Sequence, residues 1–394
     1  MVFLIAIFLS FVIYGLVDSL FPSVWPQMAV DINLSVELIG VIVMIMSAGS
    51  GIASAFAYKV RRKLGTSRSI VSGFILFAIA LVLFLTAKNI VMICIALAIM
   101  GFGNGIIDTV ANSYVIKAYD SAKLSILHAS WGLGSSIGPI LMGFAITNTE
   151  SYKNGFLWTI IILIIAIVVF LSLKIYWETK KKTLDKDFVA LHSVSEEEKE
   201  SKSNLLDIFK IENGVMFVTC FIIMGSVNTV LNSWMPTIAV GQRGMSVAEG
   251  ATTATCFFVG LTATRLLFGL VANKISNQKV IYGGLIISLI GYAMLFVRNN
   301  NAYYMYATAV MMGIGISPLI PFMHSSVKEI FDEEYMGIVV SCCNSTSLVG
   351  GALVSAFATF FAKLVGINYV QILFIILITL GIILYSKIIR RRKV

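Results

Sequence analysis

The sequence predicts an all-α polytopic membrane protein with twelve transmembrane helices in two pseudo-symmetric six-helix bundles. Of its 394 residues, 58% are hydrophobic and 12% are charged, the apolar residues form long runs, and the two halves can be aligned on each other. A mean hydropathy of +0.92 excludes an ordinary soluble domain, because so few charges could not cover a water-exposed surface. The net charge of +9 does not indicate nucleic acid, since the basic residues lie in short clusters between apolar runs.

The apolar runs set the predicted spans, since a helix needs roughly 20 apolar residues to cross the hydrocarbon core of a bilayer. The spans are expected near residues 2–27, 35–60, 69–87, 90–116, 124–147, 155–177, 214–237, 246–272, 280–297, 302–327, 337–362 and 368–389. The first run has no basic leader before it, so we expect it to be retained as a helix.

A long polar segment separates the sixth and seventh spans. It divides the chain into an N-terminal bundle (1–177), a cytoplasmic linker (178–213) and a C-terminal bundle (214–394). Within the linker, the segment from Asn204 to Lys210 has the pattern of a short amphipathic helix at the membrane surface.

The distribution of basic residues predicts the orientation. Of the 29 Lys and Arg residues, 23 fall on the side of both termini, five fall on the opposite side, and Arg265 lies inside a span. We therefore expect a multi-pass protein of the cell (inner or plasma) membrane with both termini in the cytoplasm, and we expect a monomer. The five cysteines lie in apolar segments without metal-ligand spacing, so we expect neither a metal site nor a cofactor.

An internal repeat relates the two halves. Asp18 aligns with Asn228 at an offset of 210 residues, and Asn112 aligns with His324 at an offset of 212. Further matches at similar offsets are Gly15/Gly225, Pro26/Pro236, Gly49/Gly260, Gly101/Gly313 and Gly103/Gly315. A near-constant offset across separate helices indicates duplication of a six-helix unit. Asp108 aligns with a non-acidic residue, so the acids of the spans are confined to the N-terminal half.

Three charged residues lie inside predicted spans, namely Asp18, Asp108 and Arg265. Because a charge in the bilayer core costs at least a few kcal/mol, such residues usually face a cavity or a partner. Removal from water favours the neutral carboxyl group, which can then load and release a proton. Our hypothesis is that Asp108, helped by Asp18, is the proton-coupling site. The alternative is that either acid lies near a helix end or pairs with a structural partner.

The fifth span presents His128, Trp131 and Ser135 on one face. An imidazole, an aromatic plate and a hydroxyl group suit a polyol, whose C–H faces lie against aromatic rings. The alternative is that Trp131 fills a bundle core and His128 bonds a neighbouring helix. The candidate substrate-binding residues are Asn104, Asn112, His128, Trp131, Ser135, Asn228, Asn232, His324 and Asn344.

Other features of the spans have structural interpretations. Trp25, Trp158 and Trp234 lie close to span ends, where tryptophans commonly form an interfacial belt. Pro139 and Pro318 mark kinks or broken helices. Gly134, Gly138 and Gly143 are expected to permit close packing of helices.

The duplication around a polar central loop resembles the major facilitator superfamily. The loop signature of that family, a Gly followed by Asp-Arg-x-Gly-Arg-Arg, is recognisable between Gly269 and Lys279, although an Asn replaces its acid. That departure places the family's charge relay in doubt here. Structural or gating roles are expected for Arg265, Asn273, Lys274, Gly138 and Pro139.

Within that superfamily, the stretch from Asp108 to Asn112 resembles the acid-Thr-x-Ala-Asn of the fucose permease group of fucose, galactose or glucose:proton symporters. The stretch from Leu124 to Gly134 resembles the next helix of that group, with His128 in place of a Gln. The resemblance implies symport of a sugar or similar small polar solute by alternating access, with Asp108 titrating. The implied partners are a sugar-like small molecule, protons and the lipid bilayer.

Two alternative functions remain open. The run from Gly134 through Pro139 to Gly143 resembles part of the antiporter signature of drug exporters, although Ser125 and Met142 replace two of its glycines. A proton-driven efflux antiporter for drugs or metabolites is therefore the alternative. An intramembrane aspartyl hydrolase would leave the repeat without a role, and the sequence has no phosphate loop or metalloprotease motif. We do not expect an enzyme, and we assign no catalytic residues.

Overall fold

The computed structural model describes residues 2–118, 121–172, 205–271, 275–297, 299 and 301–392, and all regular structure in these ranges is helical. The N-terminal bundle comprises α1 (Val2–Asp31), η1 (Val36–Leu38), α2 (Ile39–Thr86), α3 (Ile90–Ala118), α4 (Ser121–Thr149) and α5 (Tyr152–Ser172). The C-terminal bundle comprises η3 (Leu205–Lys210), α7 (Gly214–Arg243), α8 (Val247–Val271), α9 (Asn277–Met294), α10 (Ala302–Ile316), α11 (Leu319–Ile330), α12 (Glu333–Val365), η5 (Ile367–Tyr369) and α13 (Val370–Arg392).

Each predicted span overlaps a helix, and the tenth falls on two helices, α10 and α11. Ten helical stretches of the described residues are long and apolar enough to cross a membrane, and the apolar part of α12 over Val349–Val365 forms a shorter one. Helix η3 falls where the sequence predicts an amphipathic helix. The end of the predicted sixth span (173–177) and most of the predicted linker (178–204) lie outside the described residues, so the boundaries of the two bundles stay predictions.

Two predicted breaks are present in the structure. The basic cluster at residues 61–68 separates the second and third predicted spans, and α2 is there two helices that meet at a kink rather than at a longer loop. The kink is at Gly65, whose φ of 78° is one that a residue without Cβ adopts easily. The tenth span is also broken, since α10 ends at Ile316 and α11 begins after Pro318.

Two of the three tryptophans near span ends are not interfacial. Trp25 and Trp234 are fully buried in the helix packing, whereas Trp158 is half-buried and contacts the exposed Phe144. The indole Nε1–H of Trp25 donates to the carbonyl oxygen of Val36 at 2.7 Å, and so ties α1 to η1. For Trp25 the interfacial prediction is wrong because a backbone carbonyl satisfies its polar edge in place of lipid headgroups. Trp234 is also buried, and its Nε1 has no hydrogen-bond partner within the described residues.

The repeat is visible in how the helices pack. The carbonyl oxygen of Ala98 approaches Gly49, and the carbonyl oxygen of Val310 approaches Gly260 at the equivalent place in the other half. Likewise, Gly101 packs against the Met46 carbonyl, as Gly313 packs against the Phe257 carbonyl. In each case a Cβ would overlap a backbone atom, so both halves use glycine to bring the same pair of helices together.

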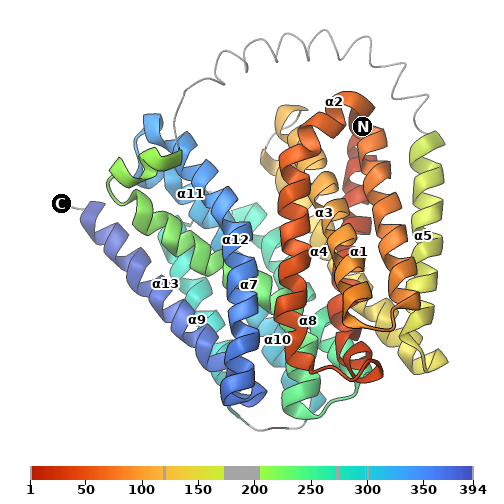
Figure 1. Ribbon diagram of the computed structural model, residues 1–394. Coiled ribbons are helices and arrows are strands. Elements are labelled where there is room, and N and C mark those ends of the chain that lie inside the picture. The colour runs from red at the N-terminus through yellow and green to blue at the C-terminus, as the bar shows by residue number, and fades with distance from the viewer. Residues whose placement is uncertain are drawn as a thin grey trace.

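The two bundles meet chiefly through α4 with α8, α2 with α12, and α1 with α7. In Figure 1 both chain ends lie toward the same face, here called the chain-end face, and the C-terminal bundle leans away from the N-terminal bundle on that side. The contacts between bundles lie toward the opposite face, where Thr359 Oγ1 donates to the Glu37 carbonyl and Gly241 contacts Ile367. The molecule is therefore closed at the opposite face.

Candidate functional site

The two acids of the spans are each held by an asparagine. The amide of Asn104 on α3 donates to Asp18 Oδ1 on α1 at 2.8 Å. One turn further along α3, the amide of Asn112 donates to Asp108 Oδ1 at 3.0 Å. The predicted polar face of α3 therefore exists, but its first member reaches across to α1 while the other two bind each other.

Both acids belong to one electrostatic group. Asp18 and Asp108 interact with each other, and the hydroxyl group of Tyr14 interacts with both. All three side chains remain partly accessible, although they lie in the middle of their helices. Accessible carboxylates within a helix bundle indicate a wetted space, because lipid contact would be too costly for them.

The face of α4 that carries His128 and Trp131 points toward the C-terminal bundle. The Trp131 ring lies 5.9 Å from the Phe258 ring of α8, and the Arg265 guanidinium carbon lies 5.8 Å from its centroid. His128 is exposed and interacts electrostatically with Arg265 and with His324 of α11. This placement favours a role at the contact between bundles over the alternative of core filling.

Several buried polar atoms of α4, α7, α8 and α11 have no hydrogen-bond partner within the described residues. They are Trp131 Nε1, Ser135 Oγ, Asn228 Oδ1, Asn232 Oδ1, Arg265 Nε and His324 Nε2. The Trp131 N–H does lie near Asp18, but without hydrogen-bond geometry. Because an unsatisfied buried group costs about 1–3 kcal/mol, these atoms call for water or a polar ligand as a partner.

The remaining predicted residues have other locations. Gly138 packs against the Leu16 carbonyl and Ser19 and so supports the contact of α1 with α4, and Pro139 lies within an unbroken α4. Asn344 lies on α12, but its side chain is outside the described part of the structure. Asn273 and Lys274 also lie outside the described residues.

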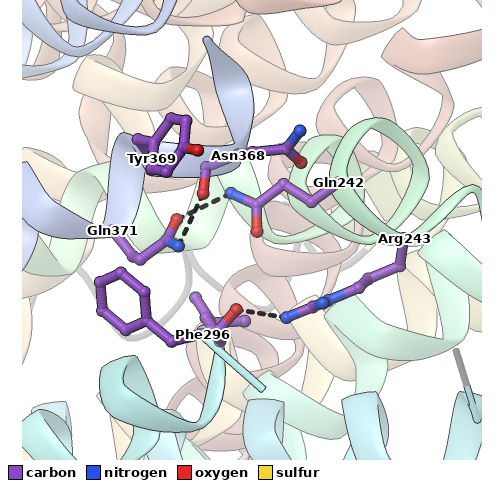
Figure 2. Close-up of a pocket in the computed structure, with 7 residues that line it drawn as sticks. Gln242, Arg243, Phe296, Asn368, Tyr369 and Gln371 are labelled. Carbon is purple, nitrogen blue, oxygen red and sulfur yellow. Dashed lines mark hydrogen bonds between the residues drawn. The ribbon is translucent and has the colours of Figure 1, made fainter. Parts of the chain in front are cut away.

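A second cluster of polar residues lies at the opposite face, within the C-terminal bundle (Figure 2). It lines a cavity of about 260 Å³ with Gln242, Arg243, Leu295, Phe296, Asn368, Tyr369 and Gln371. Gln242 donates to the Ile367 carbonyl at 2.7 Å and to Gln371 at 3.1 Å, and Arg243 donates to the Leu295 carbonyl. These bonds tie the end of α7 to the segments before α10 and α13, which explains the cluster structurally.

Sequence reasoning missed Tyr14 and Phe258, which complete the surroundings of the acids and of Trp131. Tyr14 lies four residues before Asp18, so helical spacing already placed both on one face of α1. For Phe258 the sequence carries no comparable signal, because an aromatic residue in a span is ordinary and its partner is on another helix.

Two pseudo-symmetric bundles of membrane helices with charged side chains at their contact define a polytopic membrane protein of the transporter type. A family model described as the Major Facilitator Superfamily matches residues 7–255 and 220–394. The chain belongs to that superfamily.

The relatives of this chain have different functions. The glucose/mannose transporter GlcP of Bacillus subtilis (strain 168) is 22% identical over 86% of this chain and 83% of that protein. The multidrug transporter protein MdtP of the same organism is 21% identical over 75% of this chain and 63% of that protein. The solved structure of a D-xylose-proton symporter has a TM-score of 0.74 and 16% identity, with coverage of 97% of this chain and 95% of the other. That likeness establishes the shared fold.

Proposed function

We propose that this protein is a secondary active transporter that carries a sugar or similar small polar solute together with protons. The observation that supports this most directly is the group formed by Asp18, Asp108 and their asparagine partners, together with the amide oxygens of Asn228 and Asn232 on α7, which have no partner among the described residues. Such a group offers both an exchangeable proton and hydrogen bonds for hydroxyl groups. Similarity to a glucose/mannose transporter also supports a sugar-like solute.

Alternating access provides the mechanism in this proposal. The Trp131 face lies where the two bundles meet, and the Asp18–Asp108 pair adjoins it through Asp18, so in this proposal rocking of one bundle against the other exposes the acids to each side in turn. With both termini in the cytoplasm of a cell-membrane protein, the structure is the state closed toward the outside. The proposed unit is a monomer, because each chain contains both bundles.

The role of Asp108 is tested with purified protein in liposomes. With an acidic exterior, the unaltered protein accumulates labelled galactose or glucose, whereas Asp108→Asn retains exchange of labelled for unlabelled sugar but loses uphill accumulation. The matched control is Asp332→Asn, since Asp332 is exposed at the start of α12 and its side chain makes no capping bond. Unchanged accumulation by Asp108→Asn would overturn this assignment of the proton site.

Proton-driven efflux is the second candidate, because MdtP is a multidrug transporter. The same liposomes distinguish the two functions. An acidic exterior drives a symported solute inward, whereas it drives the solute of an antiporter outward from preloaded liposomes. Outward movement of a hydrophobic compound, together with no uptake of any sugar, favours efflux.

A further inference from the structure

Arg265 places a permanent positive charge at the contact between the bundles. It belongs to α8, and its guanidinium group lies over the Trp131 ring of α4 at 5.8 Å. One turn before it on α8, Thr262 packs against Gly132, which is the neighbour of Trp131. Arg265 is therefore fixed beside the candidate site rather than free at a helix end.

This arginine has no acidic partner among the described residues. The acids of the N-terminal bundle are held by other groups, since Asn104 donates to Asp18 and Asn112 donates to Asp108. The Nε–H of Arg265 is buried and makes no hydrogen bond within the described part of the chain. A charge within the membrane-spanning part of a protein is costly unless it faces a cavity or a partner, so this half-buried arginine beside an accessible site favours an anion that arrives from solution.

The guanidinium group itself suits a carboxylate. It is planar and always charged, and two of its N–H groups can donate in parallel to the two oxygens of a carboxylate. The Arg265 guanidinium carbon lies 5.8 Å from the centroid of the Trp131 ring, a cation–π distance that helps to hold the arginine beside α4.

The neighbouring helix adds acceptors for hydroxyl groups. Asn228 and Asn232 lie one turn apart on α7, which packs against α8, and both amide oxygens are buried without a partner among the described residues. An acceptor without a donor is satisfied by a ligand O–H group. Together, the arginine and the two amide oxygens would bind a small molecule that carries one carboxylate and several hydroxyl groups.

We propose that the transported solute is a sugar acid, a hydroxyl-rich monocarboxylate whose carboxylate group is bound by Arg265. This inference rests on the proposed function and narrows its substrate class. Arg265 becomes a specificity-determining residue, in place of the structural or gating role expected from sequence.

The test compares matched acid and neutral sugars. Binding of D-galacturonate and D-galactose, and of D-glucuronate and D-glucose, is measured by isothermal titration calorimetry on the purified full-length protein. The unaltered protein is expected to bind each acid about tenfold or more tightly than its neutral counterpart. Arg265→Gln is expected to abolish that preference by weakening binding of the acids alone, and Arg265→Lys to weaken it partly, because a lysine lacks the fork.

Arg62→Gln is the matched control, because it removes an exposed positive charge of α2 far from the contact of α4 with α8. It should leave the preference for acid over neutral sugars unchanged.

Three outcomes would overturn the inference. Equal loss of binding of the acid and the neutral sugar in Arg265→Gln, with the variant still monodisperse, would show that the arginine acts on the structure. Binding of neutral sugars without binding of acids overturns this inference but not the proposed sugar transport. Binding of neither overturns both.

Discussion

Replacement of Gly40 by alanine should shift the protein away from the state closed at the opposite face. Gly40 lies near the start of α2, and a Cβ there would overlap the carbonyl oxygen of Ser355 and the Oγ1 of Thr359 on α12. Because α2 and α12 belong to different bundles, this contact exists only while the opposite face is closed. The substitution therefore destabilises that state and spares any state in which the bundles have separated there.

The size of this destabilisation depends on which atom the added Cβ would overlap. A backbone carbonyl cannot rotate away as a side chain can, so α2 and α12 must move apart. Overpacking of this kind costs about 1–3 kcal/mol. Since about 1.4 kcal/mol changes an equilibrium tenfold, the ratio of closed to open populations at the opposite face should fall about 5- to 140-fold.

Spin-label distances measure this shift. In a background without native cysteines, labels at the exposed positions Lys63 of α2 and Lys328 of α11 report on the chain-end face. Gly40→Ala should enrich a shorter distance, because that face closes when the opposite face opens. The control is Gly51→Ala in the same helix, where no atom lies within 4 Å of the added Cβ. An unchanged distance distribution in Gly40→Ala would refute the reasoning.

Three further predictions concern stability within and beside the N-terminal bundle. Gly134→Ala should lower thermal stability by about 1–3 kcal/mol, because the new methyl group would overlap a backbone carbonyl of α1. Gly143→Ala should stay within about 0.5 kcal/mol, since its nearest neighbour would lie at an ordinary 3.6 Å. Trp25→Phe should cost about 1–3 kcal/mol, because the Val36 carbonyl loses its donor. All three are checked by loss of the monodisperse peak after heating, and equal melting of the two glycine variants would contradict the packing argument.

The positions of most helices could be predicted from the sequence, because length and hydropathy alone decide whether a segment can cross a bilayer. The internal repeat could also be predicted from the sequence. The equivalent packing contacts of Gly49 and Gly260 confirm that these two positions correspond in the two halves. Local chemistry was less decisive. Nothing in residues 61–68 shows that the break there is a kink at Gly65 between two helices rather than a longer loop.

For the candidate site, too, the sequence predicted one part and the tertiary structure decided the other. Helical spacing by itself placed Asn104, Asp108 and Asn112 on one face of α3, and the cost of a charge in lipid made Asp18 and Asp108 stand out. Only the tertiary structure paired Asn104 with Asp18 and laid Arg265 over a ring of the other bundle. The physical reason is how far apart in sequence the residues lie that decide each property. Periodicity and burial cost are properties of one helix, whereas partner choice depends on how helices far apart in sequence cross and rotate against one another.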